Sequence, residues 1–450
     1  MLARYTLALC LLSLSAFSQI TVQFPTSRIV FQRTNQNTSN FYLSGTCPAD
    51  LDKIEARLIP RATNQGTPTE WTTVEEYPIS GYYCGTLSGQ GGWYDLQVRG
   101  VKNGLVSGDT AILERVGIGE VFLIVGHSNA EGGASPSRAS FDDRVSSIFF
   151  EQGTSNHTQY LQTADTSFLP NTYTQLCETC ALTPFGYPWY WSQLGDSLAN
   201  QLNVPILFYG AAFGGSNMDL TYKAAYDIPF THGFINYSIR MPYANIRNTI
   251  NKYIPVTGIR GILSSHGIND AGNSSEDFFN YSAGVIGKTR QETNHAKLAW
   301  MVAISAYNNG VAQHIVDAQY RVLQETSDTF QGPDLNLITN AGRKDNLHLN
   351  EEGQRLAAIS WANAIVTSNF LSQSEPIQPK PVRVYIPPTT AQSGNWSDQG
   401  IWCCQQVPKT TDQVFIKNGH VIDLSFPIQI RALNTSGTIR FDQNGSLEIR

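Results

Sequence analysis

The sequence predicts an α/β protein in which a mostly parallel sheet is preceded by a β-sandwich and followed by a short all-β module. Three changes of pattern carry this prediction. Residues 20–115 show short alternating segments separated by Gly, Asn, Pro and Thr, with no helical period. After Gly117, apolar strand runs alternate with amphipathic stretches, which is typical of a parallel sheet with helices on both faces. Residues 391–450 return to short β-like segments.

The 450 residues are too many for one ordinary hydrophobic core, so we expect several units. The expected units are a signal peptide at 1–19, an Ig-like β-sandwich at 20–115, an α/β domain at 116–370, a proline-rich linker at 371–390 and a β-rich module at 391–450. In the last unit, Trp396, Trp402 and Asn418-Gly419-His420 resemble the opening of β-solenoid or adhesion modules of exported bacterial enzymes. This resemblance allows association with the cell surface through the module.

The N-terminus has the composition of a secretory signal. Arg4 precedes an apolar run that is too short to span a bilayer, and small residues stand just before Gln19. We therefore expect a chain that is secreted or held at the cell surface, without a transmembrane segment. Charged residues make up only 15% of the chain and its net charge is -6, which argues against nucleic acid as a partner.

Six cysteines follow the predicted cleavage site, namely Cys47, Cys84, Cys177, Cys180, Cys403 and Cys404. An even number is compatible with disulfides in an oxidising compartment, although the sequence does not give their pairing. Cys47 and Cys84 lie in the predicted sandwich and are candidates to staple it. Cys177 and Cys180 favour a local bridge over a zinc site, because no second pair at ligand spacing follows them.

Apolar periodicity places the elements of the α/β domain. The run from Val121 to Val125 is apolar at every position, as in a strand buried on both faces. Further elements are expected in order: a helix at 189–202, strands at 205–209, 259–264 and 298–306, a helix at 311–324, and a helix that Asn350 caps and that ends near Phe370.

Polar residues and glycines follow the first three of these strands. Ser128 follows the first on a turn that Gly126 allows, Gly215 and Asn217 follow the second, and Asn269 follows the third. Parallel strands place their carboxyl ends at one edge of a sheet, where ligands bind. We therefore expect these residues to meet at that edge.

Asp345 and His348 stand three residues apart, just before the last helix of this domain, so they can meet on one turn. A serine nucleophile must lose its proton to an imidazole, which a carboxylate holds in one tautomer. Ser128, His348 and Asp345 are the candidates for these three roles. The oxyanion formed during attack on an ester needs fixed donors, for which the Ser128 and Gly215 N–H groups and the Asn269 amide are candidates.

In this order, the serine, glycine, asparagine and Asp-x-x-His blocks resemble the SGNH hydrolase superfamily. GEVFLIVGHSNA, PILFYGAAFGGSN and RMPYANIRNTI look more narrowly like its sialate O-acetylesterase and carbohydrate-esterase branch. The resemblance spans residues 117–370 and implies a flavodoxin-like, three-layer fold. Two blocks depart from that branch: His127 stands where glutamine is usual, and residues 264–268 replace its Trp-His-Gln-Gly-Glu block.

The resemblance implies a secreted serine esterase that removes acetyl groups from an acetylated carbohydrate, with no metal and no organic cofactor. His127, His266 and Asn217 are candidates to contact the substrate, and a structural role is the alternative for His266. A lipid or aryl esterase would share the same catalytic residues and prefer longer acyl chains. A non-catalytic glycan-binding or adhesion protein is the alternative of a different class, which the flanking β modules favour.

Overall fold

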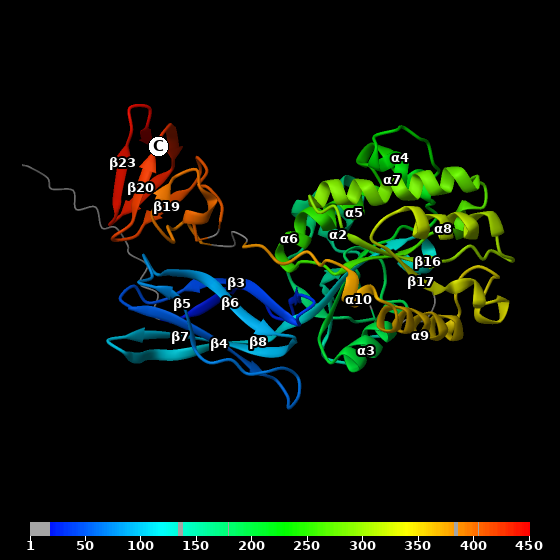
Figure 1. Cartoon of the computed structure of the whole chain (residues 1–450), viewed down its shortest axis with the longest axis horizontal. Helices are drawn as coiled ribbons and strands as arrows, with labels where there is room; N and C mark the ends of the chain where they lie inside the picture. The colour runs from blue at the N-terminus through cyan, green and yellow to red at the C-terminus, as the bar shows by residue number, and fades with distance from the viewer. Residues whose placement is uncertain (1–18, 134–137, 179, 382–385, 404) are drawn as a thin grey trace, which may run out of the picture.

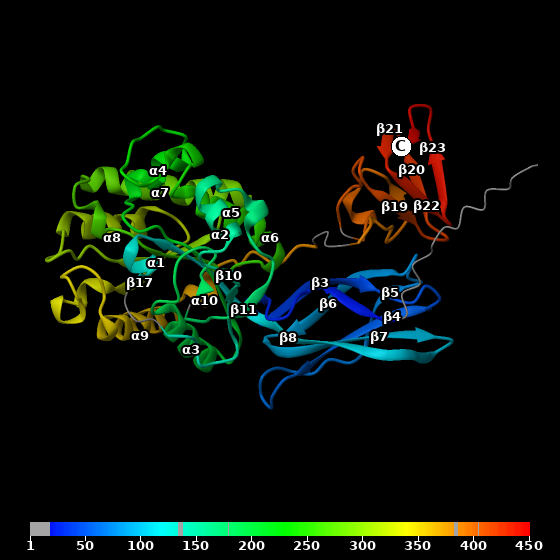
Figure 2. The same ribbon diagram turned by 180° about the vertical axis from the view of Figure 1, so that it is seen from behind.

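A computed structural model describes residues 19–133, 138–178, 180–381, 386–403 and 405–450 (Figure 1). The predicted signal peptide, apart from Gln19, lies outside these residues, as do Cys404 and part of the predicted linker. Two views show a β-sandwich, a unit of helices around a sheet, and a C-terminal β unit (Figures 1 and 2). Within the described ranges, every helix is too short or too polar to cross a membrane.

Two sheets form the sandwich. One contains the antiparallel strands β1 (Thr21–Phe24), β3 (Thr38–Thr46) and β6 (Tyr82–Gln90). The other contains β4 (Lys53–Pro60), β5 (Thr72–Glu76), β7 (Gly92–Lys102) and the first half of β8 (Leu105–Gly126), with β2 (Val30–Gln32) parallel to β8. Side chains from both sheets, including Phe41 and Val98, fill the space between them. The alternation in residues 20–115 therefore reflects one buried face on each strand.

Strand β8 joins the sandwich to the α/β unit. Its first half pairs antiparallel with β7, and the part from Glu120 onward lies in a parallel sheet. The predicted boundary between residues 115 and 116 therefore falls inside one strand. At this junction, the fully buried carboxylate of Glu120 accepts hydrogen bonds from Arg33 and Arg260, both at 2.8 Å.

The α/β unit contains the expected parallel sheet. Its strand order is β9 (Val145–Ile148), β14 (Ile206–Ala211), β8, β15 (Gly261–Ser265), β16 (Ala299–Ile304) and β17 (Thr329–Asp334). β11 (Tyr173–Gln175) pairs antiparallel with β9, and the short strand β13 (Pro184–Phe185) pairs with β14. The five parallel strands other than β9 have the flavodoxin-like order 2-1-3-4-5, and this fold binds ligands at the carboxyl end of its first strand. The α/β fold class is therefore confirmed.

Helices cover both faces of this sheet (Figure 1). One face packs against α4 (Met218–Ala225), α5 (Tyr243–Lys252), α7 (Ser275–Thr293) and α8 (Gln313–Glu325), and the other against α3 (Trp191–Leu202) and α9 (Glu351–Thr367). Alternate residues of β8 point to opposite faces of the sheet. Leu123 and Val125 belong to the hydrophobic core under α4, α5, α7 and α8, and Phe122 and Ile124 to the core under α3 and α9. The expected helices at 189–202, 311–324 and after Asn350 are confirmed as α3, α8 and α9.

Smaller elements complete this unit. They are the helices α1 (Ser128–Glu131), α2 (Ser155–Thr163), α6 (Ile254–Thr257) and α10 (Phe370–Gln373), and the strands β10 (Phe150–Glu151) and β12 (Cys180–Ala181).

The C-terminal unit consists of parallel strand pairs formed by successive turns of the chain. They are β18 (Gly394–Asn395), β20 (Val421–Leu424) and β23 (Thr438–Phe441) in one sheet, β19 (Gln413–Ile416) with β22 (Ala432–Thr435), and β21 (Pro427–Ile430) with β24 (Ser446–Ile449). Trp396, Trp402 and Ile422 are in its core. Stacking of successive turns is the arrangement of a β-solenoid.

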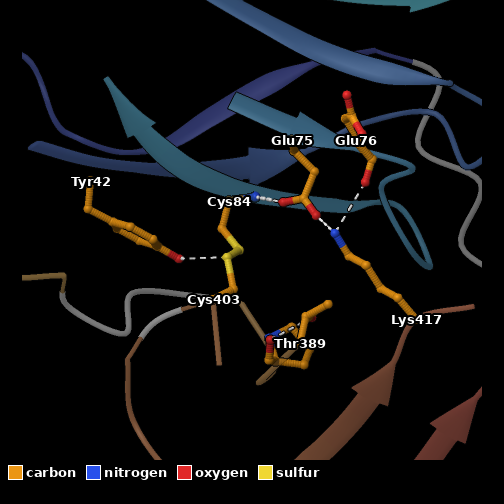
Figure 3. The surroundings of a disulfide bond; sticks show 8 residues. Tyr42, Glu75, Glu76, Cys84, Thr389, Cys403 and Lys417 are labelled. Carbon is orange, nitrogen blue, oxygen red and sulfur yellow. Dashed lines mark hydrogen bonds and ion pairs between the residues drawn. A yellow bond between two sulfur atoms is a disulfide. The ribbon is translucent and has the colours of Figure 1, made fainter. Parts of the chain in front are cut away.

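Disulfides join distant and local parts of the chain. The local bridge between Cys177 and Cys180 is confirmed. The suggested staple between Cys47 and Cys84 is wrong, because Cys84 is bonded to Cys403 of the C-terminal unit (Figure 3). Among the described residues, Cys47 is the free cysteine, and it is buried. The strand register gives the reason, because Cys84 lies opposite Ser44 on β3 rather than opposite Cys47.

Candidate active site

Ser128 stands directly beyond the carboxyl end of β8, as the first residue of α1. The turn needs glycine at 126, where φ is +150° and a Cβ would lie 2.5 Å from the Ser265 carbonyl oxygen on β15. N–H groups in the first turn of a helix have no acceptor within the helix. Ser128 therefore offers both a half-buried hydroxyl and a main-chain donor at this edge.

The structure brings Ser128, His348 and Asp345 together although 220 residues separate the first two. The Nε2 atom of His348 lies 3.0 Å from Ser128 Oγ, and its Nδ1 atom lies 2.7 Å from Asp345 Oδ2. The second Asp345 oxygen accepts the main-chain N–H of His348 at 2.6 Å and that of Leu347 at 3.1 Å. These bonds fix the carboxylate and the ring on one turn.

The electrostatics of this turn keep Asp345 ionised. The small burial of the carboxyl would raise its pKa, but the hydrogen bonds from the His348 ring and from the His348 and Leu347 N–H groups lower that pKa to about 2. An ionised carboxylate at Nδ1 holds the ring proton on that nitrogen and leaves Nε2 as the acceptor that faces Ser128. The arrangement can therefore take a proton from the serine hydroxyl.

The glycine and asparagine blocks meet beside the serine. A Cβ on Gly214 would lie 3.8 Å from Ser128 Cβ, so the turn that contains Gly215 borders the hydroxyl. Gly215 has φ +74°, which favours glycine. Asn269 donates from Nδ2 to the Ser216 carbonyl at 2.8 Å, which ties the third block to the second and leaves its other amide hydrogen for a ligand.

Asn217 is half-buried, and its side chain caps helix α4. Its Oδ1 atom accepts the Leu220 N–H at 2.8 Å. Asn217 is predicted to bind substrate, and in the structure its side-chain oxygen is engaged by this capping hydrogen bond.

The structure buries the side chains of His127 and His266, which the sequence predicts to contact substrate. They are 0% and 4% exposed, and their ring centroids lie 6.4 Å apart. Burial, with smaller effects of nearby positive charge, lowers the pKa of His127 to about 3, and burial lowers that of His266 to about 4. Both rings are neutral at physiological pH and belong to the interior below the strand ends.

Two carboxylates near the site were not predicted. Glu131 on α1 accepts the Gly214 N–H, and burial raises its pKa to about 7. Asp270 is fully buried beside Asn269, accepts the Met218 N–H at 2.8 Å, and also has a pKa raised by burial to about 7. In sequence, Glu131 lies three residues after Ser128 and Asp270 directly follows Asn269, so their closeness to the predicted site residues was the available signal. Each one connects two of the blocks that form the site.

The features that would suggest a metal or a cofactor site lie elsewhere. Among the described residues, Glu75, Cys84 and Cys403 have ligand atoms close enough for one ion, but the two sulfurs form the disulfide. A cavity of about 840 Å³ lies in the same region, between the sandwich and the C-terminal unit, and none of the predicted site residues lines it. The relay at Ser128, rather than cavity volume, marks the candidate active site.

No protein-family model matches the sequence, and no curated protein matches it significantly. Solved structures resemble this chain in fold. A carbohydrate acetylesterase from Xanthomonas citri is 15% identical, with 83% of this chain and 79% of that chain covered and a TM-score of 0.49. An acetyl xylan esterase from the rumen bacterium Butyrivibrio proteoclasticus is 9% identical, with coverages of 78% and 98% and a TM-score of 0.32.

A candidate SGNH hydrolase from Slackia heliotrinireducens is 11% identical, with coverages of 55% and 98% and a TM-score of 0.29. At these identities the likeness concerns the fold alone. In fold, the chain resembles SGNH hydrolases, with carbohydrate acetylesterases among its structural neighbours.

Proposed function

We propose that the protein is a carboxylic ester hydrolase with Ser128 as its nucleophile. The observation that carries the proposal is the continuous relay from Asp345 through both ring nitrogens of His348 to Ser128 Oγ, with distances of 2.7 and 3.0 Å. Nucleophile, base and orienting carboxylate each have a hydrogen-bonded partner in the required order. The position beyond the first parallel strand is also where this strand order binds ligands.

In the proposed reaction, Ser128 Oγ attacks the ester carbonyl carbon while His348 Nε2 takes the hydroxyl proton. Asp345 holds Nδ1–H and stabilises the imidazolium that forms. The ester C–O bond then breaks, His348 returns the proton to the departing alcohol, and Ser128 keeps the acyl group. Water activated by His348 attacks the acyl-enzyme and releases the carboxylic acid together with the free serine.

Developing negative charge on the carbonyl oxygen needs donors that are in place before the reaction. We assign this role to the N–H groups of Ser128 and Gly215 and to the second amide hydrogen of Asn269. The bond from Asn269 to the Ser216 carbonyl supports the assignment, because it orients the amide beside the glycine turn.

We further propose that the substrate is an O-acetylated carbohydrate, in the manner of a sialate O-acetylesterase, and that the protein acts outside the cytoplasm. Structural neighbours described as carbohydrate and xylan acetylesterases support the substrate class. The signal-like N-terminus and two disulfides support export, because disulfides persist in oxidising compartments.

Turnover of p-nitrophenyl acetate by the Ser128→Ala variant tests the assignment. We expect a loss of about three orders of magnitude or more, as for other triad deletions. A fluorophosphonate probe should label wild type and not Ser128→Ala, while Ser88→Ala, on an exposed part of β6, should behave as wild type. Full turnover by Ser128→Ala would refute the proposal, and glycan binding without labelling would favour an adhesion role.

Acetate release from a panel of acetylated glycans, including acetylated sialic acid and acetylated xylan, tests the substrate class. An acyl-length series of p-nitrophenyl esters is the companion measurement. We expect the acetate ester to be the best substrate of that series. A preference for octanoate would point to a lipid esterase on the same fold.

A further inference from the structure

The segment that joins α4 to α5 folds as a closed loop. Near its two ends, Asp227 and Arg240 form an ion pair, and Tyr237 Oη donates to Asp227 Oδ1 at 3.2 Å. Compact surface loops with joined ends are frequently functional. The labels α4 and α5 mark the two ends of this connection in Figure 2.

Within the loop, neighbouring side chains have opposite environments. Ile235 is 3% exposed and belongs to the core, whereas Phe234 is 66% exposed. His232 Nδ1 accepts the N–H groups of both residues, at 3.4 and 3.3 Å, and its ring meets the Phe234 ring edge to face at 4.7 Å. The loop is therefore built to hold the phenyl ring outward.

The Phe234 ring lies against the glycine turn of the candidate active site. A Cβ on Gly215 would lie 2.4 Å from Phe234 Cζ, so the ring occupies the space that a side chain there would need. The adjacent Gly214 borders Ser128, as described above. An exposed aromatic ring is thus placed next to the turn of Gly215, whose N–H is a proposed oxyanion donor.

We propose that Phe234 is a specificity-determining residue whose ring packs against the sugar ring of an acetylated carbohydrate. This inference rests on the proposed ester hydrolase function. An acetyl group carries one methyl carbon, so the alcohol part of the ester must supply most of the surface that covers a phenyl ring. One face of a pyranose carries several C–H groups, which complement the electron-rich face of an aromatic ring. A short alkyl alcohol has no such face.

The test compares a mono-O-acetylated methyl glycoside with ethyl acetate, both followed by acetate release. For Phe234→Ala, we expect kcat/KM for the glycoside to fall about tenfold, mainly through KM, because one aromatic contact is lost. Ethyl acetate should change less than about threefold, since it has no ring to lose. Phe234→Tyr should retain glycoside activity. Phe441→Ala, which truncates a 52% exposed ring on β23, is the matched control.

Several outcomes would overturn the inference. Equal losses on both esters would mean that Phe234 only supports the Gly215 turn. An unchanged glycoside rate would mean that the ring does not contact the sugar, and a selective loss on p-nitrophenyl octanoate would place the acyl chain there. These results are distinct from failure of the proposed function, in which wild-type protein would hydrolyse no ester.

Discussion

Asn129 binds the main chain on both sides of His348. Its Nδ2 atom donates to the Leu347 carbonyl at 3.0 Å, and its Oδ1 atom accepts the Leu349 N–H at 3.2 Å. Asn129 directly follows Ser128 and is 2% exposed. One buried amide therefore joins the turn of the predicted nucleophile to the loop of the predicted base, and sets the distance between them.

The Asn129→Ala variant should lower kcat for p-nitrophenyl acetate by about 10- to 100-fold, because a displacement near 1 Å between reacting groups can cost that much. KM should change little, since Asn129 is not among the predicted substrate contacts. Steady-state kinetics gives both constants, and circular dichroism verifies that the variant is folded. Asn280→Ala, on the outer face of α7, serves as the control. Unchanged kcat would show that the relay holds its geometry without this amide.

The raised pKa of Glu131 predicts that the free energy of unfolding depends on pH. Burial raises its pKa to about 7, so the folded protein holds the proton more tightly than the unfolded chain does. The free energy of unfolding should therefore decrease as pH rises from the unfolded pKa, about 4.3, to about 7, and the loss should be complete above that range. Glu131→Gln keeps an acceptor for the Gly214 N–H and does not ionise.

Relative to wild type, Glu131→Gln should gain about 1–3 kcal/mol of stability between pH 5 and pH 8 in urea unfolding. Taking the difference between the two proteins cancels the similar contribution of Asp270. Glu70→Gln, at an exposed position of the sandwich, should show no such trend. Parallel pH profiles of wild type and Glu131→Gln would contradict the prediction.

The sequence predicted those elements whose local residue pattern matches their burial in the fold. The apolar run of β8 is buried on both faces, and Asn350 caps α9 by accepting the Gly353 N–H at 3.0 Å. The residues proposed for catalysis follow strand ends, a position that apolar periodicity locates well. Their roles stay predictions until the variants are measured.

Other elements were hidden because their local signals conflict with their environment. Helix α7 buries Ser282 and Thr289 among its apolar residues, which weakens its stripe. Strand β17 contains Gly332-Pro333, a pair typical of turns. The pairing of Cys84 with Cys403 spans 319 residues, and no local pattern encodes such a contact.

The buried ion pair between Glu120 and Arg260 predicts a large effect on stability. Arg260 is 1% exposed, and Glu120 Oε2 accepts its Nε–H at 2.8 Å. Arg260→Met should destabilise the fold by about 3–5 kcal/mol, because a carboxylate that has lost a charged partner stays buried. Arg355→Met, which breaks an exposed pair with Glu352, should have little effect. Chemical denaturation of both variants checks this, and equal losses would show that burial of the pair is unimportant.

The bond between Cys84 and Cys403 predicts that the C-terminal unit stays attached after the linker is cut. Beside the bond, Lys417 of that unit pairs with Glu75 of the sandwich (Figure 3). With a specific protease site inserted in residues 371–390, the cleaved protein should run as one species on a denaturing gel without reductant and as two with it. Cys84→Ser should separate under both conditions, whereas Cys47→Ser should behave as wild type. Release of the fragment from unreduced wild type would mean that Cys84 has another partner, because only a covalent link between the two pieces survives denaturation.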